Sequence, residues 1–352
     1  MTTFAAPVPT TLREVRLEIP ADLQQPNTAL AIWSLLIVAA EVVVASAIAW
    51  FVWDRGWWLA APIAWAAGST AMMGLFVIGH DCGHSSFLKS KRAMTIIGHV
   101  VHSPVLYPYW SWKYSHDAHH RHTNLLGRGE GGVYFDNAWT PYLTDHYEAT
   151  KQRNPAAGWL YRAARWVPPF GSFLHLLWIH WLPKKFRAGR ERNRVYFSMA
   201  VTVTTAIGLI TTLWIGFGSP LAPLHFFVIP ALLFHCWMSL YTYLHHTTPD
   251  VHLHHAETWN PFVAQMDGTV NVFTPRWISF LHFNIDVHIP HHVTTRIPSY
   301  RLRAANEALR DGTWGSIMRE HPLTIRYMIN QVKACHLWDA ERDGFVRFDE
   351  LP

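Results

Sequence analysis

The stretch ALAIWSLLIVAAEVVVASAIAWFVW at residues 29–53 decides the fold, because it is long and apolar enough to cross a lipid bilayer as a helix. A bilayer core of about 30 Å requires roughly 20 apolar residues in helical form. Three further stretches meet this requirement: WWLAAPIAWAAGSTAMMGLFVIG (57–79), YFSMAVTVTTAIGLITTLWIGFG (196–218) and PLHFFVIPALLFHCWMSLYTYL (223–244). We therefore predict an all-α, polytopic membrane protein with four transmembrane helices.

Short turns at 54–56 and 219–222 join these stretches in pairs, which predicts two transmembrane hairpins. A weaker apolar run at 93–110 contains two histidines and two prolines, so we expect a re-entrant or interfacial segment there. The predicted divisions are an N-terminal segment (1–28), a first hairpin (29–79), a polar segment (80–195), a second hairpin (196–244) and a C-terminal segment (245–352).

The distribution of positive charge predicts the orientation, because cytoplasmic loops carry the excess of Lys and Arg. The two short turns contain one Arg between them. The segment between the second and third spans contains Lys89, Lys91, Arg92, Lys113, Arg121, Arg128 and the run KKFRAGRERNR at 184–194. We expect this side and both termini to be cytoplasmic, in a bacterial inner membrane or, alternatively, a plastid or thylakoid membrane.

Composition argues against several other classes of protein. Half of the residues are hydrophobic and 15% are charged, against about 25% charged in an average soluble domain. The net charge of +5 is modest, and no long basic stripe interleaved with aromatics suggests nucleic-acid binding. The three cysteines are far apart, which argues against a disulfide framework or a cysteine zinc site. The N-terminus shows no pattern of a secretory signal.

Histidine is unusually frequent, with 24 residues, and eight of them gather in three short motifs. The motifs HDCGH (80–84), HDAHH (116–120) and HIPHH (288–292) place histidines three or four residues apart, which is one face of a helix. We expect helices over 110–122 and from about Asp286 to just before Pro298. The clustered histidines, all on the predicted cytoplasmic face, are His80, His84, His116, His119, His120, His288, His291 and His292.

This many imidazoles predicts a site for two metal ions, because one ion takes only four to six ligands. His246, at the end of the fourth apolar stretch, is a ninth candidate, and the adjacent His245 is its rival. Imidazole suits Zn, Cu, Fe and Ni. A structural zinc site needs only four ligands, so a redox pair of irons with open positions for oxygen fits the number better.

Carboxylates and amides beside the motifs are candidates for orienting these histidines, since a ligating imidazole usually donates its other N–H to such a group. Asp81 directly follows His80, and we expect it to orient a histidine from a different motif. The full set of candidates is Asp81, Asp117, Asn124, Asp267, Asn284 and Asp286.

Most of the other histidines are expected to be packed or solvent-facing rather than ligating. They are His99, His102, His122, His175, His180, His225, His235, His252, His254, His255, His282 and His336. Cys82 is expected to be a small packed residue. SYRLRAANEALRDG at 299–312 predicts an amphipathic helix with Ser299 as N-cap and Gly312 as its stop, and the residues after 320 suggest a surface tail.

With GHDCGHSSF (79–87), HDAHHRHTN (116–124), TYLHHTTPD (242–250) and FNIDVHIPHHVTTRIPSYRL (283–302), the chain resembles the membrane fatty acid desaturases over roughly residues 30–340. The similarity is greatest to their acyl-lipid, delta-12-type branch. The resemblance implies a di-iron centre held by the eight clustered histidines, with His246 matching the histidine of the family's QHT-like motif. No appended b-type cytochrome domain is recognisable, which implies a separate electron donor such as ferredoxin.

The implied reaction is O2-dependent insertion of a cis double bond into a membrane acyl chain, with delta-12 of an 18:1 chain as the expected position. The alternatives within the superfamily are an alkane or fatty-acyl hydroxylase and a carotenoid-modifying enzyme. A membrane metal transporter or a haem electron carrier is the alternative from another class. Both usually place their histidines inside the spans, whereas here the clusters lie at the span ends.

Overall fold

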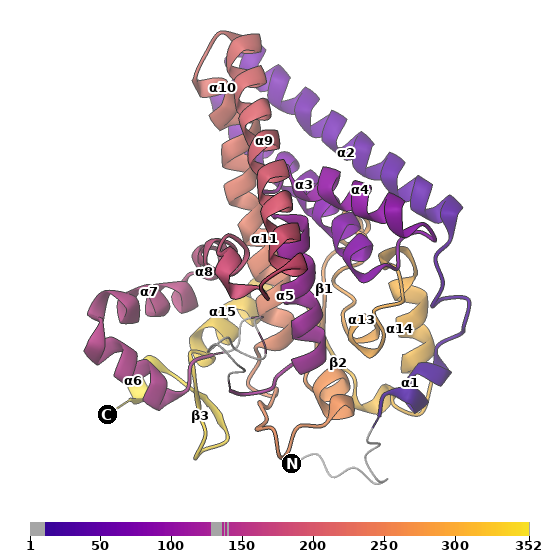
Figure 1. Cartoon of the computed structure of the whole chain (residues 1–352), viewed down its shortest axis with the longest axis vertical. Helices are drawn as coiled ribbons and strands as arrows, with labels where there is room; N and C mark the ends of the chain where they lie inside the picture. Colours follow the sequence, from indigo (N-terminus) through magenta and orange to yellow (C-terminus); the bar gives the residue numbers. More distant parts are fainter. Residues whose placement is uncertain (1–10, 128–135, 137, 139–140, 352) are drawn as a thin grey trace.

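A computed structural model of the chain describes residues 11–127, 136, 138 and 141–351, and these residues are mostly helical (Figure 1). Four helices are long and apolar enough to cross a membrane, as predicted. The α-helical parts of these four segments are α2 (Thr28–Arg55), α3 (Ala61–His84), α9 (Arg190–Phe217) and α11 (Ile229–His246). Residues 1–10 of the predicted N-terminal segment, and Arg128 of the predicted basic segment, lie outside the described residues.

Two tight connections join these helices in the order that the sequence predicts. α2 ends at Gly56, whose φ of +64° is a left-handed conformation that glycine adopts without strain. The short η1 (Trp58–Ala60) then leads into α3, which packs along α2. Between α9 and α11 lie the short α10 (Leu221–Pro223) and the π-helical η5 (Leu224–Val228), at the top of Figure 1.

The four long helices differ in how much of their apolar surface the protein itself covers. The most apolar part of α3 is 56% buried and that of α11 is 50% buried, and the two helices pack against each other. The corresponding parts of α2 and α9 are 22% and 6% buried. Because apolar surface on this scale is unfavourable in water, the outward faces of α2 and α9 are suited to contact with lipid.

Between α3 and α9, the described chain forms several shorter helices. They are α4 (Lys91–His102), α5 (Tyr109–His122), α6 (Thr144–Arg153), α7 (Pro155–Trp166), α8 (Pro168–His175), the π-helical η3 (Leu176–His180) and η4 (Pro183–Lys185). α4 occupies the weaker apolar run. Its 12 residues span about 18 Å, which is too short to cross a bilayer and agrees with an interfacial or re-entrant segment.

The chain after α11 adds short helices and strands, and α1 (Arg13–Glu18) packs against one of these helices, α14. The helices are η6 (Val263–Asp267, a π-helix), α12 (Arg276–Leu281), α13 (Ile289–Val293), η7 (Ser299–Arg301), α14 (Leu302–Arg310), η8 (Gly315–Ile317), α15 (Ile325–Ala334) and η9 (Phe348–Glu350). The strands are β1 (Val270–Phe273), β2 (Arg319–Pro322), β3 (Leu337–Asp339) and β4 (Gly344–Val346).

Two features of this C-terminal part correct the predictions. The all-α class misses two small sheets: β1 pairs in parallel with β2, and β3 pairs antiparallel with β4. The residues after 320 are also no surface tail, because Leu337 and Trp338 are buried and the Tyr243 hydroxyl of α11 donates to the Cys335 carbonyl at 3.1 Å. The helix predicted at 299–312 is confirmed as η7 and α14, although its N-cap position is Pro298 instead of Ser299.

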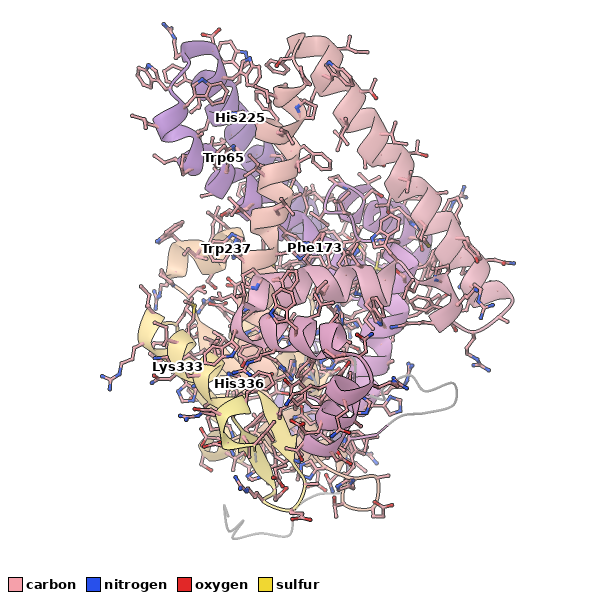
Figure 2. All side chains as sticks on the ribbon, turned by 90° about the vertical axis from the view of Figure 1, so that its left-hand side faces the viewer. Trp65, Phe173, His225, Trp237, Lys333 and His336 are labelled. Carbon is pink, nitrogen blue, oxygen red and sulfur yellow. The ribbon has the colours of Figure 1, made fainter. Side chains whose placement is uncertain are left out.

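Several of the histidines that we expected to be packed or solvent-facing are buried. His225 lies against Trp65, whose Nε1 is 3.1 Å from its Nδ1. Figure 2 shows this pair near one end of the molecule and His336 well away from it, in the lower half of the view. Cys82 is buried among apolar side chains. The remaining buried members are His99, His102, His180, His235 and His282.

Candidate functional site

The first motif ends α3, where His80 and His84 share one helix face in the last turn. Gly79 and Gly83 lie in the same turn, and a Cβ at either position would overlap the ring of His102 or of Trp112. The absence of these two Cβ atoms lets α4 and α5 approach α3 closely. The glycines of GHDCGH therefore bring the second motif up to the first.

The second motif forms the last turns of α5, which begins at Tyr109 after Pro108 and ends at His122. The predicted helix over 110–122 is thus confirmed. Pro108 is the N-cap residue of this helix. Its backbone is extended, and the proline ring fixes its φ angle near −65°. His116, His119 and His120 then lie on the face that meets α3 and α13.

The third motif is only partly helical, which corrects the predicted boundaries of its helix. α13 contains five residues, and His288 is its N-cap instead of lying within a helix that starts near Asp286. The two histidines are still one helical turn apart, because the His292 N–H donates to the His288 carbonyl at 3.0 Å. The side-chain oxygen of Asn271 in β1 accepts hydrogen bonds from the N–H groups of His288 and Ile289, at 2.6 and 2.9 Å. These bonds satisfy backbone donors at the start of the helix that have no partner within it.

The side chains of these segments converge at one place, with imidazole nitrogens facing one another. Ligand atoms within 4.8 Å of one another form two groups, one of His80, His84, His116 and His291, the other of His119, His246 and His292. His120 lies between the groups, with its Nε2 3.1 Å from that of His116 and its ring centroid 4.3 Å from that of His292.

His288 completes the second group. Of the two adjacent histidines of α11, His246 is the one whose ring nitrogen faces this group. The Nε2 of His288 lies 3.1 Å from that of His246 and 3.0 Å from that of His292. The ring of His245 stacks on the ring of His288 instead, with centroids 4.1 Å apart. The structure therefore brings together all nine predicted histidines and leaves His245 beside them.

Burial favours the neutral form of five of these imidazoles. It lowers the pKa of His116, His120, His288, His291 and His292 well below the ordinary value, and the neighbouring imidazoles lower it further. A neutral imidazole has one nitrogen with a free lone pair, which is the form that binds a metal. Acceptor lone pairs about 3 Å apart would repel one another unless protons or cations lay between them.

Two of the expected orienting residues lie beside cluster histidines, and a third acts through another carboxylate. Asp81 lies 3.1 Å from the Nδ1 of its own neighbour, His80, and not beside a histidine of another motif, which corrects that detail. Its other oxygen accepts from the Ser299 N–H at 2.6 Å. One oxygen of Asp117 lies 4.0 Å from the Nδ1 of His84. Asn124 donates from its backbone N–H to a carboxylate that also holds His119.

The other three expected orienting residues bind arginines and backbone instead of histidines. Asp267 pairs with Arg319, with 2.6 Å between Oδ1 and Nη2. Asp286 accepts from Ser279 and Thr274 and lies near Arg303, which also donates to Asn284. Proximity to the motif in sequence is thus a poor guide here, because the turns around α13 direct these side chains away from the imidazoles.

Two residues that the sequence analysis missed hold histidines by short hydrogen bonds. The Nδ1 of His119 donates to Asp136, which is 1% exposed, at 2.7 Å. The Nδ1 of His292 donates to the Oε1 of Gln265 at 2.6 Å, and the Nε2 of Gln265 donates to the His120 carbonyl at 2.8 Å. Gln265 lies on the π-helical η6, a kind of turn that is frequent at functional sites.

The arrangement of nitrogens fits a pair of metal ions. Asp81, Asp136 and Gln265 engage the Nδ1 atoms of His80, His119 and His292, so that the Nε2 atoms face inward. Other buried cluster nitrogens have no hydrogen-bond partner among the described residues, including those of His84 and His291. Buried polar atoms without partners are costly, and coordination would satisfy them.

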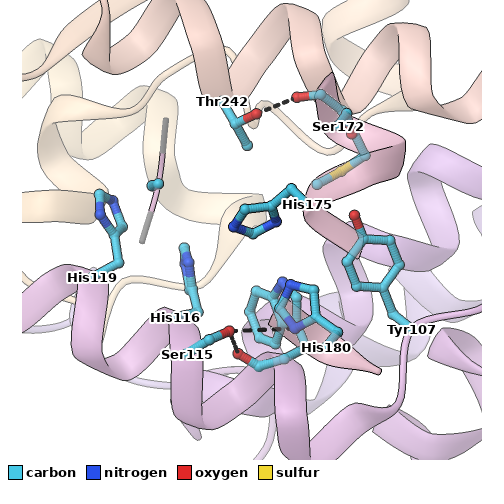
Figure 3. A pocket seen from close by; sticks show the side chains of 11 residues that line it. Tyr107, Ser115, His116, His119, Ser172, His175, His180 and Thr242 are labelled. Atoms are coloured by element: carbon cyan, nitrogen blue, oxygen red, sulfur yellow. Dashed lines mark hydrogen bonds between the residues drawn. The ribbon is translucent and has the colours of Figure 1, made fainter. Parts of the chain in front are cut away.

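A small cavity opens beside the cluster, with a volume of about 60 Å³. Figure 3 shows His116 and His119 on one side of it and Tyr107, His175 and His180 on the other. His175 and His180, which we expected to be packed or solvent-facing rather than ligating, both line it. The full lining is Tyr107, Trp112, Ser115, His116, His119, Ala138, Ser172, His175, His180, Met238 and Thr242.

Comparison with known proteins decides the family. The sequence pattern of the fatty acid desaturase family matches residues 55–327, which include all three motifs and His246. The chain belongs to the fatty acid desaturase family. The protein is therefore an oxidoreductase, and its four apolar helices agree with a membrane enzyme.

Named relatives of this desaturase occur in cyanobacteria and plants. The chain is 38% identical over 304 residues to the sn-1 oleoyl-lipid 12-desaturase of Synechocystis sp., which covers 84% of this chain and 80% of the relative. It is 36% identical over 343 residues to the chloroplastic omega-6 fatty acid desaturase of Arabidopsis thaliana, covering 97% and 72%. It is 37% identical over 265 residues to the sn-1 oleoyl-lipid 12-desaturase of Anabaena variabilis, covering 75% and 72%.

Proposed function

We propose that this desaturase introduces a cis double bond at delta-12 of an oleoyl chain carried by a membrane lipid. The observation that carries the proposal is the convergence of nine histidines, from four separate segments, beside a cavity whose wall includes His116 and His119. The names of the relatives support the lipid-linked oleoyl substrate and the delta-12 position.

Two iron ions are the proposed occupants of the cluster. His80, His84, His116 and His291 would hold one, and His119, His246, His288 and His292 the other, with His120 between them. Imidazole ligands alone allow several metals. Removal of hydrogen from an unactivated chain with O2 requires a redox metal, which favours iron over zinc.

The proposed membrane arrangement puts the two hairpins in the bilayer and the histidine cluster on its cytoplasmic side, beneath a helical cap. The basic residues of the segment between α3 and α9 support this orientation through the positive-inside rule. The cluster lies at the ends of α3 and α11 that are opposite to α10 in Figure 1. An acyl chain would then enter from the lipid and reach the cavity without crossing water.

The overall reaction converts one CH2–CH2 unit, O2, two electrons and two protons into one CH=CH unit and two waters. When bound, the iron pair would supply the activation of O2. The protein's own groups have other tasks: Trp112, Tyr107 and Met238 exclude water from the cavity, while Asp136 and Gln265 hold the Nδ1 protons of His119 and His292. A separate donor, for which we propose ferredoxin, would deliver the electrons.

The test is expression in a host that lacks polyunsaturated lipids, with a ferredoxin supplied, followed by mass-spectrometric mapping of double bonds. We expect a new double bond at delta-12 of 18:1 chains. It should disappear in His119→Ala and persist in His252→Ala, a half-exposed loop histidine. A hydroxylated product would instead assign a hydroxylase, and unchanged lipids from iron-loaded protein with the donor present would contradict desaturation.

A further inference from the structure

A second cavity, of about 570 Å³, lies beside the first turns of α5. Tyr109, Trp110 and Lys113 of α5 line it, whereas Trp112, His116 and His119 of the same helix line the first cavity. α3, α4 and α9 supply the other walls. The two cavities share no lining residue and are therefore separate.

Four cations line this second cavity, which we call the basic pocket: Lys91, Arg92, Lys113 and Arg194. Lys113 is already engaged, because it donates to Asp117 at 2.8 Å and to the Gly83 carbonyl at 2.6 Å. Within the described part of the chain, the other three have no carboxylate within 4.0 Å. The pocket therefore carries an excess of positive charge that the described residues do not neutralise.

One of these cations is held in place. The guanidinium of Arg194 lies 4.6 Å from the centre of the Trp110 ring, and its Nη1 donates to the Tyr114 hydroxyl at 3.3 Å. Stacking on an aromatic ring restricts an arginine side chain and leaves its in-plane N–H groups available. A planar guanidinium held in this way is well suited to a phosphate or similar oxyanion.

The basic pocket lies where the apolar surface of the protein begins. Ile96 is part of its wall and is 57% exposed, and Val100 on the next turn of α4 is 64% exposed. Arg194 lies in the second turn of α9, just before that helix becomes apolar, and Phe197 beyond it is 59% exposed. An apolar rim beside a cationic hollow corresponds to the boundary between acyl chains and headgroups in a bilayer.

We propose that the basic pocket binds the phosphate of an anionic phospholipid that is distinct from the substrate chain. Arg92, Arg194 and Lys91 would hold the phosphate, and the acyl chains would lie along Ile96 and Val100. A basic pocket between helices at the cytoplasmic headgroup level is a recognised type of anionic-lipid site. A concave hollow with an apolar rim suits a headgroup better than the broad surface of an acidic protein.

The experiment compares lipid retention by the full-length, metal-loaded protein after reconstitution into phosphatidylcholine vesicles that contain phosphatidylglycerol as a minor component. The protein is re-extracted and the bound lipid is counted by native mass spectrometry. We expect wild-type protein to retain phosphatidylglycerol in preference to phosphatidylcholine. The double variant Arg92→Gln/Arg194→Gln should bind it about 30-fold more weakly, from about 1 kcal/mol for each cation.

The matched control removes two exposed cations elsewhere, Arg326 and Lys333 of α15, which packs against α7 and α11. Arg326→Gln/Lys333→Gln should retain phosphatidylglycerol as the wild type does. Thermal midpoints and metal contents of both variants identify any misfolding, in which case the single variant Arg92→Gln, with about fivefold weaker binding, replaces the double one.

Three results would overturn the proposal. Equal retention by the wild type and the folded pocket variant would show that the cations do not bind the lipid. Inorganic phosphate and a soluble short-chain phosphatidylglycerol can each be added as a competitor of the bound lipid. If inorganic phosphate displaced the lipid at the same concentration as the short-chain lipid, the pocket would be assigned to a free anion. Unchanged lipid retention together with loss of ferredoxin-dependent turnover would assign it to docking of the donor protein.

Discussion

Replacing Asp136 by asparagine should weaken metal binding, although the substitution changes only one atom of the side chain. The buried carboxylate accepts at least three N–H groups: Oδ1 binds His119 at 2.7 Å and Ala138 at 2.9 Å, and Oδ2 binds Asn124 at 2.7 Å. An amide has only one acceptor oxygen. In either orientation, Asp136→Asn turns an NH2 group toward at least one of these donors.

The size of the effect follows from which donor loses its partner. A buried donor left unpaired costs about 1–3 kcal/mol, which corresponds to about 5–150-fold in an equilibrium constant. If the NH2 group faces His119, the imidazole can avoid the clash only by moving its proton to Nε2, the nitrogen that faces the other histidines. That tautomer cannot bind a metal through Nε2, so we expect metal affinity to fall by about 10–100-fold.

The assay is metal retention during titration with a chelator, together with double-bond formation in cells. Asp343→Asn is the matched control, because Asp343 also lies beside a histidine, at 3.6 Å from His252, but is 72% exposed. An Asp136→Asn protein that folds and retains metal within twofold of the wild type would refute this reasoning about the tautomer.

Three further predictions concern packing, the cavity and pH. Gly79→Ala should destabilise the protein by about 1–3 kcal/mol, because its Cβ would overlap His102, whereas Gly208→Ala on open α9 should not lower the thermal midpoint. Met238→Trp should fill the cavity and abolish desaturation with metal content unchanged, and the volume-conserving Met238→Leu should retain activity in lipid analysis. Burial lowers the pKa of His282 to about 3, so the unfolded chain binds the extra proton below pH 6.5 and stability falls as pH falls. Between pH 7.5 and 5.5 this residue should lower the free energy of unfolding by about 1.4 kcal/mol. In denaturation experiments, the decrease in stability over this pH range should be smaller by that amount in His282→Gln than in the wild type.

The parts of the fold that the sequence predicts well are those with a regular period or a required length. The four long helices follow from bilayer thickness alone, and α5 follows from its histidine spacing. Likewise, the convergence of the motifs follows from counting ligands, because no other arrangement satisfies so many imidazoles near span ends. These inferences need no knowledge of tertiary contacts.

The parts that the sequence predicts poorly depend on single side chains in irregular segments. Asp136 and Gln265 lie outside the motifs, and no spacing distinguishes them from other polar residues in loops. Asp286 lies within a motif region but points toward Ser279 and Arg303, because the backbone turns there through left-handed conformations at Phe283 and Asn284. The small strands are not predicted, because three or four residues are too few to show the alternating pattern of a strand.

The order of the histidines along the chain has a consequence for biosynthesis. The first group has three of its members by His116, but its fourth, His291, is added only after α9 and α11 have been made. A ribosome must therefore translate nearly the whole protein before either group is complete. A nascent chain arrested after α11 would lack His288, His291 and His292, so neither metal position could be completed until the membrane helices had already been synthesised.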